Sequence, residues 1–472
     1  MKTTLIPFLT LALAFSPVAA PAQKSQQVAP SPIAKNSDDA VLDGKRPDPL
    51  AWIEHDALAA ACANLGEPER QKFRATGDLI ELRPVSVPQG EWLHLDRNGV
   101  PLTHFGWPVA LRHEGVIHVV HPRGFTHTRP TKGNERDART AVVRSTNDGR
   151  SFEPVPGLLV SALDDVPLSM QLAATPSGNA STGRSNMIGG GGPRSAGVID
   201  GKIVVASDRG VFRSDDSGVA WRRLEGAGMP AQIRTWPSAG AGPAMLVHPR
   251  EGLVCLAATI DKKLLIRTSK DQGKTWQERS IPFDEPIQEP SGLVYEGRLI
   301  LMPRTDAAKG TPKPGARAYY QCWSDPAWTS FQKQPTNILA GERDTTDVKY
   351  NPVSRRIEAI VTNRMGGGPG HESDNCMSLN LWSIAPDALL AGSGEWRFDG
   401  TLLRSGGREH DRGNPLGLER DGMCPASVIA EDLGVQFIYV YMGHFQGPTG
   451  IFQITRTLDT DRLRHRLLET TR

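Results

Sequence analysis

Three arginines stand at the ends of segments that share one pattern: a turn, a short apolar strand, then the arginine. The pattern occurs at 113–123, 295–304 and 354–364, with a looser copy at 200–209. If these strands repeat around a common axis, Arg123, Arg304 and Arg364 converge on one pocket. Several guanidinium groups there would bind a carboxylate or sulfate through paired N–H donors. The alternative interpretation is that each arginine ends an exposed strand and pairs locally.

Histidines crowd the part of the chain that holds the first of these arginines. Five of the 12 histidines lie within residues 104–127. His118 and His121 belong to the strand that ends at Arg123, and their odd spacing puts them on opposite faces of it, so at most one faces inward. A histidine beside arginines and a uronate is suited to act as general base or acid in β-elimination or hydrolysis. His121 is therefore a candidate, with packing or surface histidines as the alternative.

The elements that must position these side chains are short strands. Strand patterns alternate with Gly, Pro, Asn and Asp turns, for example at 116–120, 202–206, 264–266, 299–302, 357–362 and 437–441. The 48 glycines and 37 prolines among 472 residues are a load that long helices do not tolerate. The sequence therefore predicts an all-β sandwich, barrel or propeller. The glycine runs 189–192 and 366–368 lack the Lys-Ser/Thr end of a phosphate loop, and we expect them to be loops at the mouth of the fold.

A repeated turn decides between these architectures. The strings 145–152, 214–221 and 269–276 all read Ser-x-Asp/Asn-x-Gly-x-Thr/Ser/Ala-aromatic. The Asp or Asn side chain can bond turn amides, the glycine supplies a positive φ, and the aromatic ring packs under the turn. Three copies along one chain indicate a structural unit that repeats.

This turn resembles the Asp-box, or BNR repeat, of the sialidase superfamily, whose members are six-bladed β-propellers. Two degenerate copies, 323–328 and 382–396, extend the series. A last blade would hold strands 437–441 and 451–455 and be closed by a strand from within 75–110. The resemblance implies an all-β, six-bladed, sialidase-like propeller over residues 75–465. A short N-terminal helix is predicted ahead of it, within 49–74.

The resemblance also implies roles for individual residues. The string 288–304 looks like the Glu-bearing strand, turn and Arg-bearing strand of the family. By resemblance, Glu289 polarises a tyrosine nucleophile and Arg304 belongs to the arginine triad that holds the substrate carboxylate. Arg364 resembles a second member of that triad, and Arg123 resembles a further arginine near the first blade.

Two positions depart from the family pattern. The family's first-blade Arg-Ile-Pro corresponds to Phe105-Gly106-Trp107-Pro108, which has no arginine, and its tyrosine nucleophile corresponds to the string 422–429, which has no tyrosine. Such a site is not expected to run the usual double displacement. Asp208 and Asp374 are the candidates for the family's Asp acid/base. Trp107 and Trp236 are candidate platforms for stacking a sugar ring, with core packing as the alternative for both.

Together these features favour an exo-acting glycoside hydrolase on acidic sugars, either sialic or uronic acids. The alternatives are a uronate polysaccharide lyase, a glycosidase that uses histidine, and a carbohydrate-binding propeller without catalysis. Lys+Arg 54 against Asp+Glu 52 leaves a formal charge of +2, so no net field attracts nucleic acid or an anionic membrane. No cofactor or metal site is predicted.

The N-terminal residues have the features of a targeting signal. Residues 1–22 have a positive start, a short apolar run and a small-residue cleavage signal, which predict a signal peptide and a secreted or periplasmic protein. The apolar run is too short to span a membrane. Residues 23–48 read as a flexible linker. The five cysteines are scattered and odd in number, which favours buried thiols over a disulfide framework.

Overall fold

In the computed structural model, the sheets follow one another along the chain, and each is built outward from an innermost strand. The structure describes residues 80–86, 94–95, 101–102, 104–124, 139–155, 193–207, 210–223, 245–248, 251–258, 262–271, 274–305, 317–340, 345–363, 376–406, 420–444 and 449–469. Four sheets have four strands each, and a ten-stranded sheet contains two more blades joined edge to edge. The predicted all-β, six-bladed propeller is confirmed.

Each blade runs from an innermost strand outward. Blade 1 has β4 (His104–Phe105) with β5 (Val109–His113), then β6 (Val116–Gly124), β7 (Arg139–Ser145) and β8 (Glu153–Pro154). Blade 2 has β9 (Pro193–Ile199), β10 (Lys202–Ser207), β11 (Gly210–Ser214) and β12 (Arg222–Arg223). Blade 3 has β13 (Met245–His248), β14 (Gly252–Ala258), β15 (Lys263–Ser269) and β16 (Gln277–Pro282).

Blades 4 to 6 follow the same plan. Blade 4 has β17 (Ile287–Tyr295), β18 (Arg298–Thr305), β19 (Arg317–Ser324) and β20 (Phe331–Ala340). Blade 5 has β21 (Thr346–Asn351), β22 (Arg356–Asn363), β23 (Cys376–Ile384) and β24 (Arg397–Gly406). Blade 6 has β25 (Arg420–Gly422) with β26 (Ala426–Ala430), then β27 (Val435–His444), β28 (Thr449–Thr457) and β1 (Ile80–Ser86). The remaining described elements are the hairpin β2 (His94–Leu95) and β3 (Pro101–Leu102), the helices α4 (Pro386–Leu390) and α5 (Thr460–Glu469), and the 3-10 turn η9 (Glu431–Leu433).

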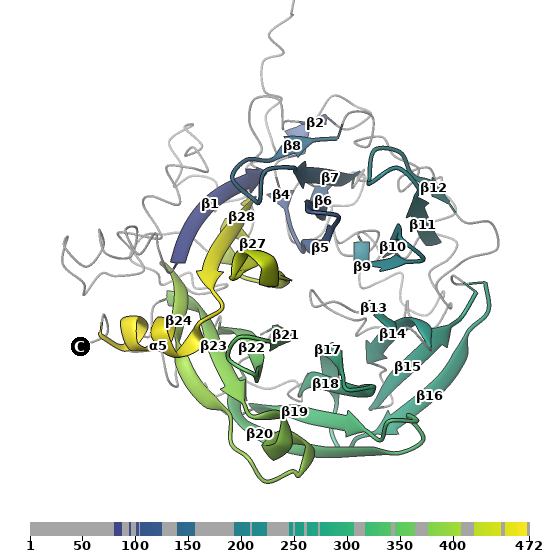
Figure 1. Ribbon diagram of the computed structural model, residues 1–472, viewed down its shortest axis with the longest axis vertical. Coiled ribbons are helices and arrows are strands. Elements are labelled where there is room, and N and C mark those ends of the chain that lie inside the picture. The colour runs from purple at the N-terminus through teal and green to yellow at the C-terminus, as the bar shows by residue number, and fades with distance from the viewer. Residues whose placement is uncertain are drawn as a thin grey trace, which may run out of the picture. The chain divides into compact units, whose positions relative to one another are not determined.

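The blades surround a common axis. The innermost strands contact one another in the circular order β5, β9, β13, β17, β21 and β26, and β26 returns to β5. Figure 1 shows β9, β13, β17 and β21 on the inside of the ring and β12, β16, β20 and β24 on the outside. The strand expected to close the last blade is β1, which pairs with β28 over Ile80–Ser86. Beside this seam, β28 also pairs in parallel with β4.

The second strand of each blade is covered on both faces by neighbouring blades. β18 and β22 are buried along their whole length after the first residue. Strands buried on both faces read as continuous apolar runs, which is why Leu299–Met302 shows no alternation in the sequence. In β22 the run Ile357–Val361 is interrupted by Glu358, whose buried charge is paired with Arg456. Alternate residues of one strand therefore pack against different neighbouring blades.

The repeated Ser-x-Asp/Asn turns join the third and fourth strands of blades 1, 2 and 3. In blade 2, the Asp216 carboxylate accepts from the Ala220 amide at 2.8 Å, and Ser214 Oγ accepts from the Gly218 amide at 2.8 Å. Gly218 has a φ of +83°. Ser145, Asn147 and Gly149 make the same bonds in blade 1. The turn chemistry expected from the sequence is therefore present.

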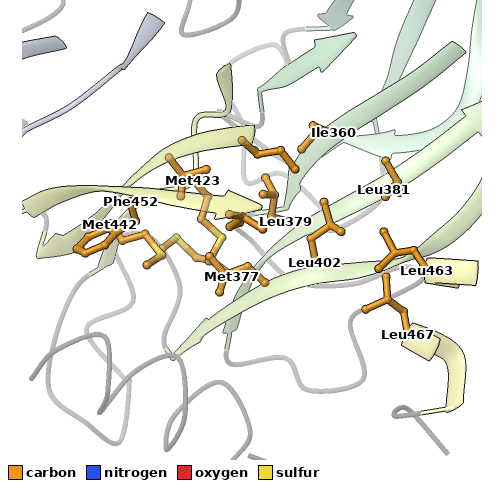
Figure 2. Packing of buried hydrophobic residues seen from close by; sticks show 14 residues of the cluster. Ile360, Met377, Leu379, Leu381, Leu402, Met423, Met442, Phe452, Leu463 and Leu467 are labelled. Carbon is orange, nitrogen blue, oxygen red and sulfur yellow. The ribbon is translucent and has the colours of Figure 1, made fainter. Parts of the chain in front are cut away.

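A buried cluster between blades 5 and 6 also holds the C-terminal helix. Figure 2 shows Leu463 and Leu467 of α5 beside Leu381 and Leu402 of blade 5. The same two blades are also joined by a fully buried ion pair between Arg456 of β28 and Glu358 of β22. The Thr460 hydroxyl, at the start of α5, donates to the same carboxylate. The helix thus fastens the last two blades together.

Several expectations fall outside the described residues, among them the signal peptide, the linker and the helix within 49–74. Of the five cysteines, Cys322 and Cys424 are buried free thiols. Within the described part of the chain, no helix combines the length and apolar character needed to cross a membrane.

Candidate functional site

Four innermost strands carry one extra residue near the same end of the propeller. The extra residue lies between two pairs of partners on the innermost and second strands, namely Phe105–Arg123 and Val109–Val120 in blade 1, Pro193–Ser207 and Ser195–Ala206 in blade 2, Gln288–Arg304 and Ser291–Met302 in blade 4, and Gly422–Met442 and Ala426–Tyr439 in blade 6. Each irregularity faces the last residues of a second strand. All innermost strands of a propeller run in the same direction, so the four bulges lie at one rim.

The bulges of blades 1, 4 and 6 each contain a non-glycine residue in the left-handed region: Trp107 (φ 38°), Glu289 (φ 46°) and Met423 (φ 62°). The other described non-glycine residues with positive φ lie in turns between consecutive strands of a blade. A positive φ inside a strand costs about 1–3 kcal/mol and persists where the surroundings impose it, often at functional sites. Bulges also redirect side chains. The strain therefore marks this rim as the candidate site.

Blade 4 contributes an ion pair. Arg304 Nε donates to Glu289 Oε2 at 2.8 Å, and the side chains are 2 % and 21 % exposed. Ile300 and Met302, on the same face of β18 as Arg304, pack in a cluster with Val348 and Ile357 of blade 5. The pair therefore lies where blades 4 and 5 meet, with the carboxylate nearer to solvent than the guanidinium.

Blade 5 contributes a carboxylate to its contact with blade 6. Asp347 is fully buried, and Lys349 Nζ pairs with its Oδ1 at 3.0 Å. Ser427 Oγ of blade 6 donates to Asp347 Oδ2, and Gln436 Nε2 donates to Ser427 at 2.7 Å. This cluster was not predicted from the sequence. Its only sequence signal is the Asp-x-Lys spacing, which places both charges on one face of a strand.

Blades 6 and 1 contribute aromatic rings. The rings of Trp107 and Tyr441 lie 5.3 Å apart and tilted by 47°. Tyr441 is fully buried, whereas Trp107 is partly exposed. The Cys424 thiol donates to Tyr441 Oη at 3.8 Å. Tyr441 was also missed, because it stands on the second strand of blade 6, outside the string 422–429 that was compared with the family's tyrosine position.

Arg123 and His121 lie in the same contact between blades 6 and 1. Both are fully buried, and the Arg123 guanidinium carbon is 4.8 Å from the centre of the Phe105 ring. The His121 ring lies 5.2 Å from the same ring, and its Nε2 is 3.2 Å from Ser86 Oγ of β1. His121 thus binds the strand that closes the ring.

The arginines at the strand ends do not occupy equivalent positions, contrary to the repeat seen in the sequence. Arg123 is eight residues past Gly115 and Arg304 is seven past Gly297, the glycines of equivalent turns. One residue of difference reverses the face. Arg123 therefore faces the preceding blade, and Arg304 faces the following one. The structure brings Glu289 and Arg304 together and places His121 and Arg123 at another blade contact.

Arg364 and Asp208 lie outside the described residues, as does Asp374. The described string 420–430 contains no tyrosine, as the sequence indicated. No group of three or more His, Cys, Asp or Glu side chains in the described ranges is placed to hold a metal ion.

The fold and the rim define a six-bladed β-propeller with a candidate polar and aromatic site at one rim. No family model and no curated protein matches the chain. Among solved structures, it is similar to a protein of unknown function from Dyadobacter fermentans, with 16 % identity, 80 % of this chain and 99 % of that chain covered, and a TM-score of 0.49.

It is also similar to the sialidase of Trypanosoma rangeli, with 13 % identity, 80 % of this chain and 59 % of that chain covered, and a TM-score of 0.46. It is similar as well to the phage phi92 endosialidase, with 10 % identity, 80 % of this chain and 69 % of that chain covered, and a TM-score of 0.47. The chain thus spans less than two thirds of the trypanosomal enzyme. Identities this low assign no activity to this chain.

Proposed function

We propose that this protein binds an acidic glycan at the rim formed by blades 4, 5, 6 and 1, and that it acts there as a sialidase-like glycoside hydrolase. The observation that carries the proposal is the Glu289–Arg304 pair, with a buried guanidinium behind a partly exposed carboxylate on a strained bulge. An arginine in this setting has N–H donors on three nitrogens and suits a ligand carboxylate.

The roles follow the sialidase resemblance where the residues permit. Arg304, with Arg364, would hold the acidic group, and Glu289 would orient or activate a partner. A tyrosine nucleophile has no counterpart in 422–429. Hydrolysis would therefore use carboxylates, for which Asp208 and Asp374 are the candidates, rather than a tyrosyl intermediate.

A second candidate function is carbohydrate binding without turnover. The observation that favours it is the same missing tyrosine, since such a propeller keeps the recognition half of the site. A lyase that uses His121 is less well supported, because this histidine is fully buried and lies beside Ser86.

The test compares two buried arginines in the full chain. Arg304→Lys changes the pair at the rim, and Arg267→Lys changes a matched pair in which Arg267 Nε donates to Glu278 at 2.7 Å on the third strand of blade 3. Binding of sialyllactose and of a glucuronate tetrasaccharide is measured by calorimetry, with circular dichroism to confirm folding. We expect Arg304→Lys to weaken binding at least tenfold and Arg267→Lys to leave it unchanged.

The chemistry is read from two assays on the same preparation. Release of the fluorophore from a fluorogenic sialoside identifies a sialidase, and absorbance of an unsaturated uronate product identifies a lyase. Binding without either signal identifies the non-catalytic protein. Equal binding by the wild type and Arg304→Lys would refute the arginine-based site.

We also propose that the protein is exported and that the leader is removed near residue 22. The support is the charge and apolar pattern of residues 1–22. Expression in a bacterial host, followed by fractionation and N-terminal sequencing, tests this. A product that keeps Met1 and stays in the cytoplasm would contradict it.

A further inference from the structure

Trp107 differs from the other two strained residues in what it presents. Met423 is fully buried in the cluster between blades 5 and 6, so its bulge serves packing. Glu289 presents a carboxylate that is bonded to Arg304. Trp107 presents a large aromatic ring that stays partly exposed, although burying it would be favourable.

The position of the indole is fixed by its neighbours. The centre of the Tyr441 ring lies 5.3 Å from the centre of the indole. Tyr441 is itself fully buried and makes an edge contact with His104, with 6.2 Å between the ring centres. A Cβ on Gly106 would lie 3.8 Å from the Tyr441 ring, an ordinary van der Waals distance, so the backbone next to the indole also packs on this tyrosine. The bulge and the buried tyrosine together hold a partly exposed indole at the rim that also bears Glu289 and Arg304.

We propose that Trp107 is the sugar-stacking platform of this site and determines its preference for a pyranose ring that carries one carboxylate. The C–H bonds on one face of a pyranose are electropositive and suit the electron-rich face of an indole. Arg304 would bind the carboxylate while Trp107 orients the ring. This inference rests on the proposed function, because it uses the same rim and the same acidic ligand.

The affinity test uses three variants and a glucuronate tetrasaccharide and sialyllactose as probes. Trp107→Phe keeps an aromatic face and should bind within about threefold of the wild type, whereas Trp107→Ala should bind about tenfold more weakly. Trp221→Ala is the matched control, because Trp221 is another partly exposed indole, placed in a blade 2 turn where its Nε1 donates to Gly218 at 3.2 Å. It should bind as the wild type does.

A second measurement does not require any variant to fold. N-bromosuccinimide oxidises exposed indoles, and mass spectrometry of the digested wild-type protein locates the oxidised residues. The acidic probes should protect Trp107 and leave Trp221 equally oxidised with and without ligand.

The outcomes separate the two proposals. If the wild type binds a probe but Trp107 is not protected and Trp107→Ala binds equally well, the platform is overturned and the acidic-glycan site stands. If the wild type binds neither probe, the proposed function falls and the platform falls with it.

Discussion

Protonation of His118 should destabilise the contact between blades 1 and 2. The ring is fully buried, and neither of its nitrogens has a hydrogen-bond partner within the described structure. The His118 ring packs tightly against the blade 2 turn, where a Cβ on Gly218 would lie 2.7 Å from the ring. Burial, with smaller contributions from the positive charge of Arg144 and from His113, lowers the pKa of His118 to about 4.

The magnitude follows from the difference between the folded and unfolded pKa values. In the unfolded chain His118 takes up a proton near its ordinary pKa of 6.5, while the folded protein stays unprotonated until about pH 4. Stability from neutral His118 is therefore complete above pH 6.5 and is lost as the pH falls toward 4. The loss amounts to about 3 kcal/mol, since each unit of pKa difference is worth about 1.4 kcal/mol.

The assay compares the wild type with His118→Gln in urea unfolding, followed by tryptophan fluorescence at several pH values between 7.5 and 4. Other titrating groups are common to both proteins and cancel in the difference. The wild type should lose about 3 kcal/mol more stability than the variant over this range. Arg144→Gln should raise the pKa of His118 and shrink the loss. Parallel curves for the wild type and His118→Gln would refute the reasoning.

Three further predictions concern packing. Glu358→Gln should cost about 3–5 kcal/mol in unfolding free energy by leaving buried Arg456 without its counter-charge, and adding Arg456→Met should recover part of the loss. Gly422→Ala should lower the free energy of unfolding by about 2 kcal/mol or more, because its Cβ would lie 2.2 Å from the Tyr441 carbonyl oxygen. Gly434→Ala is the control, since Gly434 also has a positive φ but has open space around it. It should lower stability less in the same thermal melts. Cys322 should not react with Ellman's reagent until urea unfolds the protein, because burial raises the pKa of its thiol; labelling of the folded protein by mass would contradict this.

The fold could be predicted because its repeating turn is specified by residues that are close together in the sequence. Ser214, Asp216 and Gly218 lie within one turn, and their hydrogen bonds depend on nothing outside it. The helix α5 escaped prediction although Leu463 and Leu467 have helical spacing. Its stability comes from packing on blades 5 and 6, which short local patterns do not reveal.

The candidate site was predictable only where its residues belong to one hairpin. Glu289 and Arg304 stand on paired strands of blade 4, so proximity in sequence brought them together. Asp347 and Ser427 come from different blades, as do Trp107 and Tyr441, and such pairs depend on how the blades pack. The faces of Arg123 and Arg304 differ by a single residue of turn-to-arginine spacing, a detail that the repeated pattern concealed.

The two halves of the rim depend on different parts of the chain. Glu289 and Arg304 lie within one blade formed by consecutive strands, whereas the Trp107–Tyr441 contact joins blade 1 to blade 6 across the seam that β1 and β28 close. Three contacts hold that seam. His121 lies beside Ser86, Thr449 Oγ1 accepts from the Phe105 amide at 2.7 Å, and Arg112 makes paired hydrogen bonds to Asp432. Loosening the seam would therefore separate the aromatic half of the site while leaving the Glu289–Arg304 pair intact. The proposed binding of an acidic group and the proposed ring stacking should therefore be separable, because the first depends on a local hairpin and the second on a long-range closure.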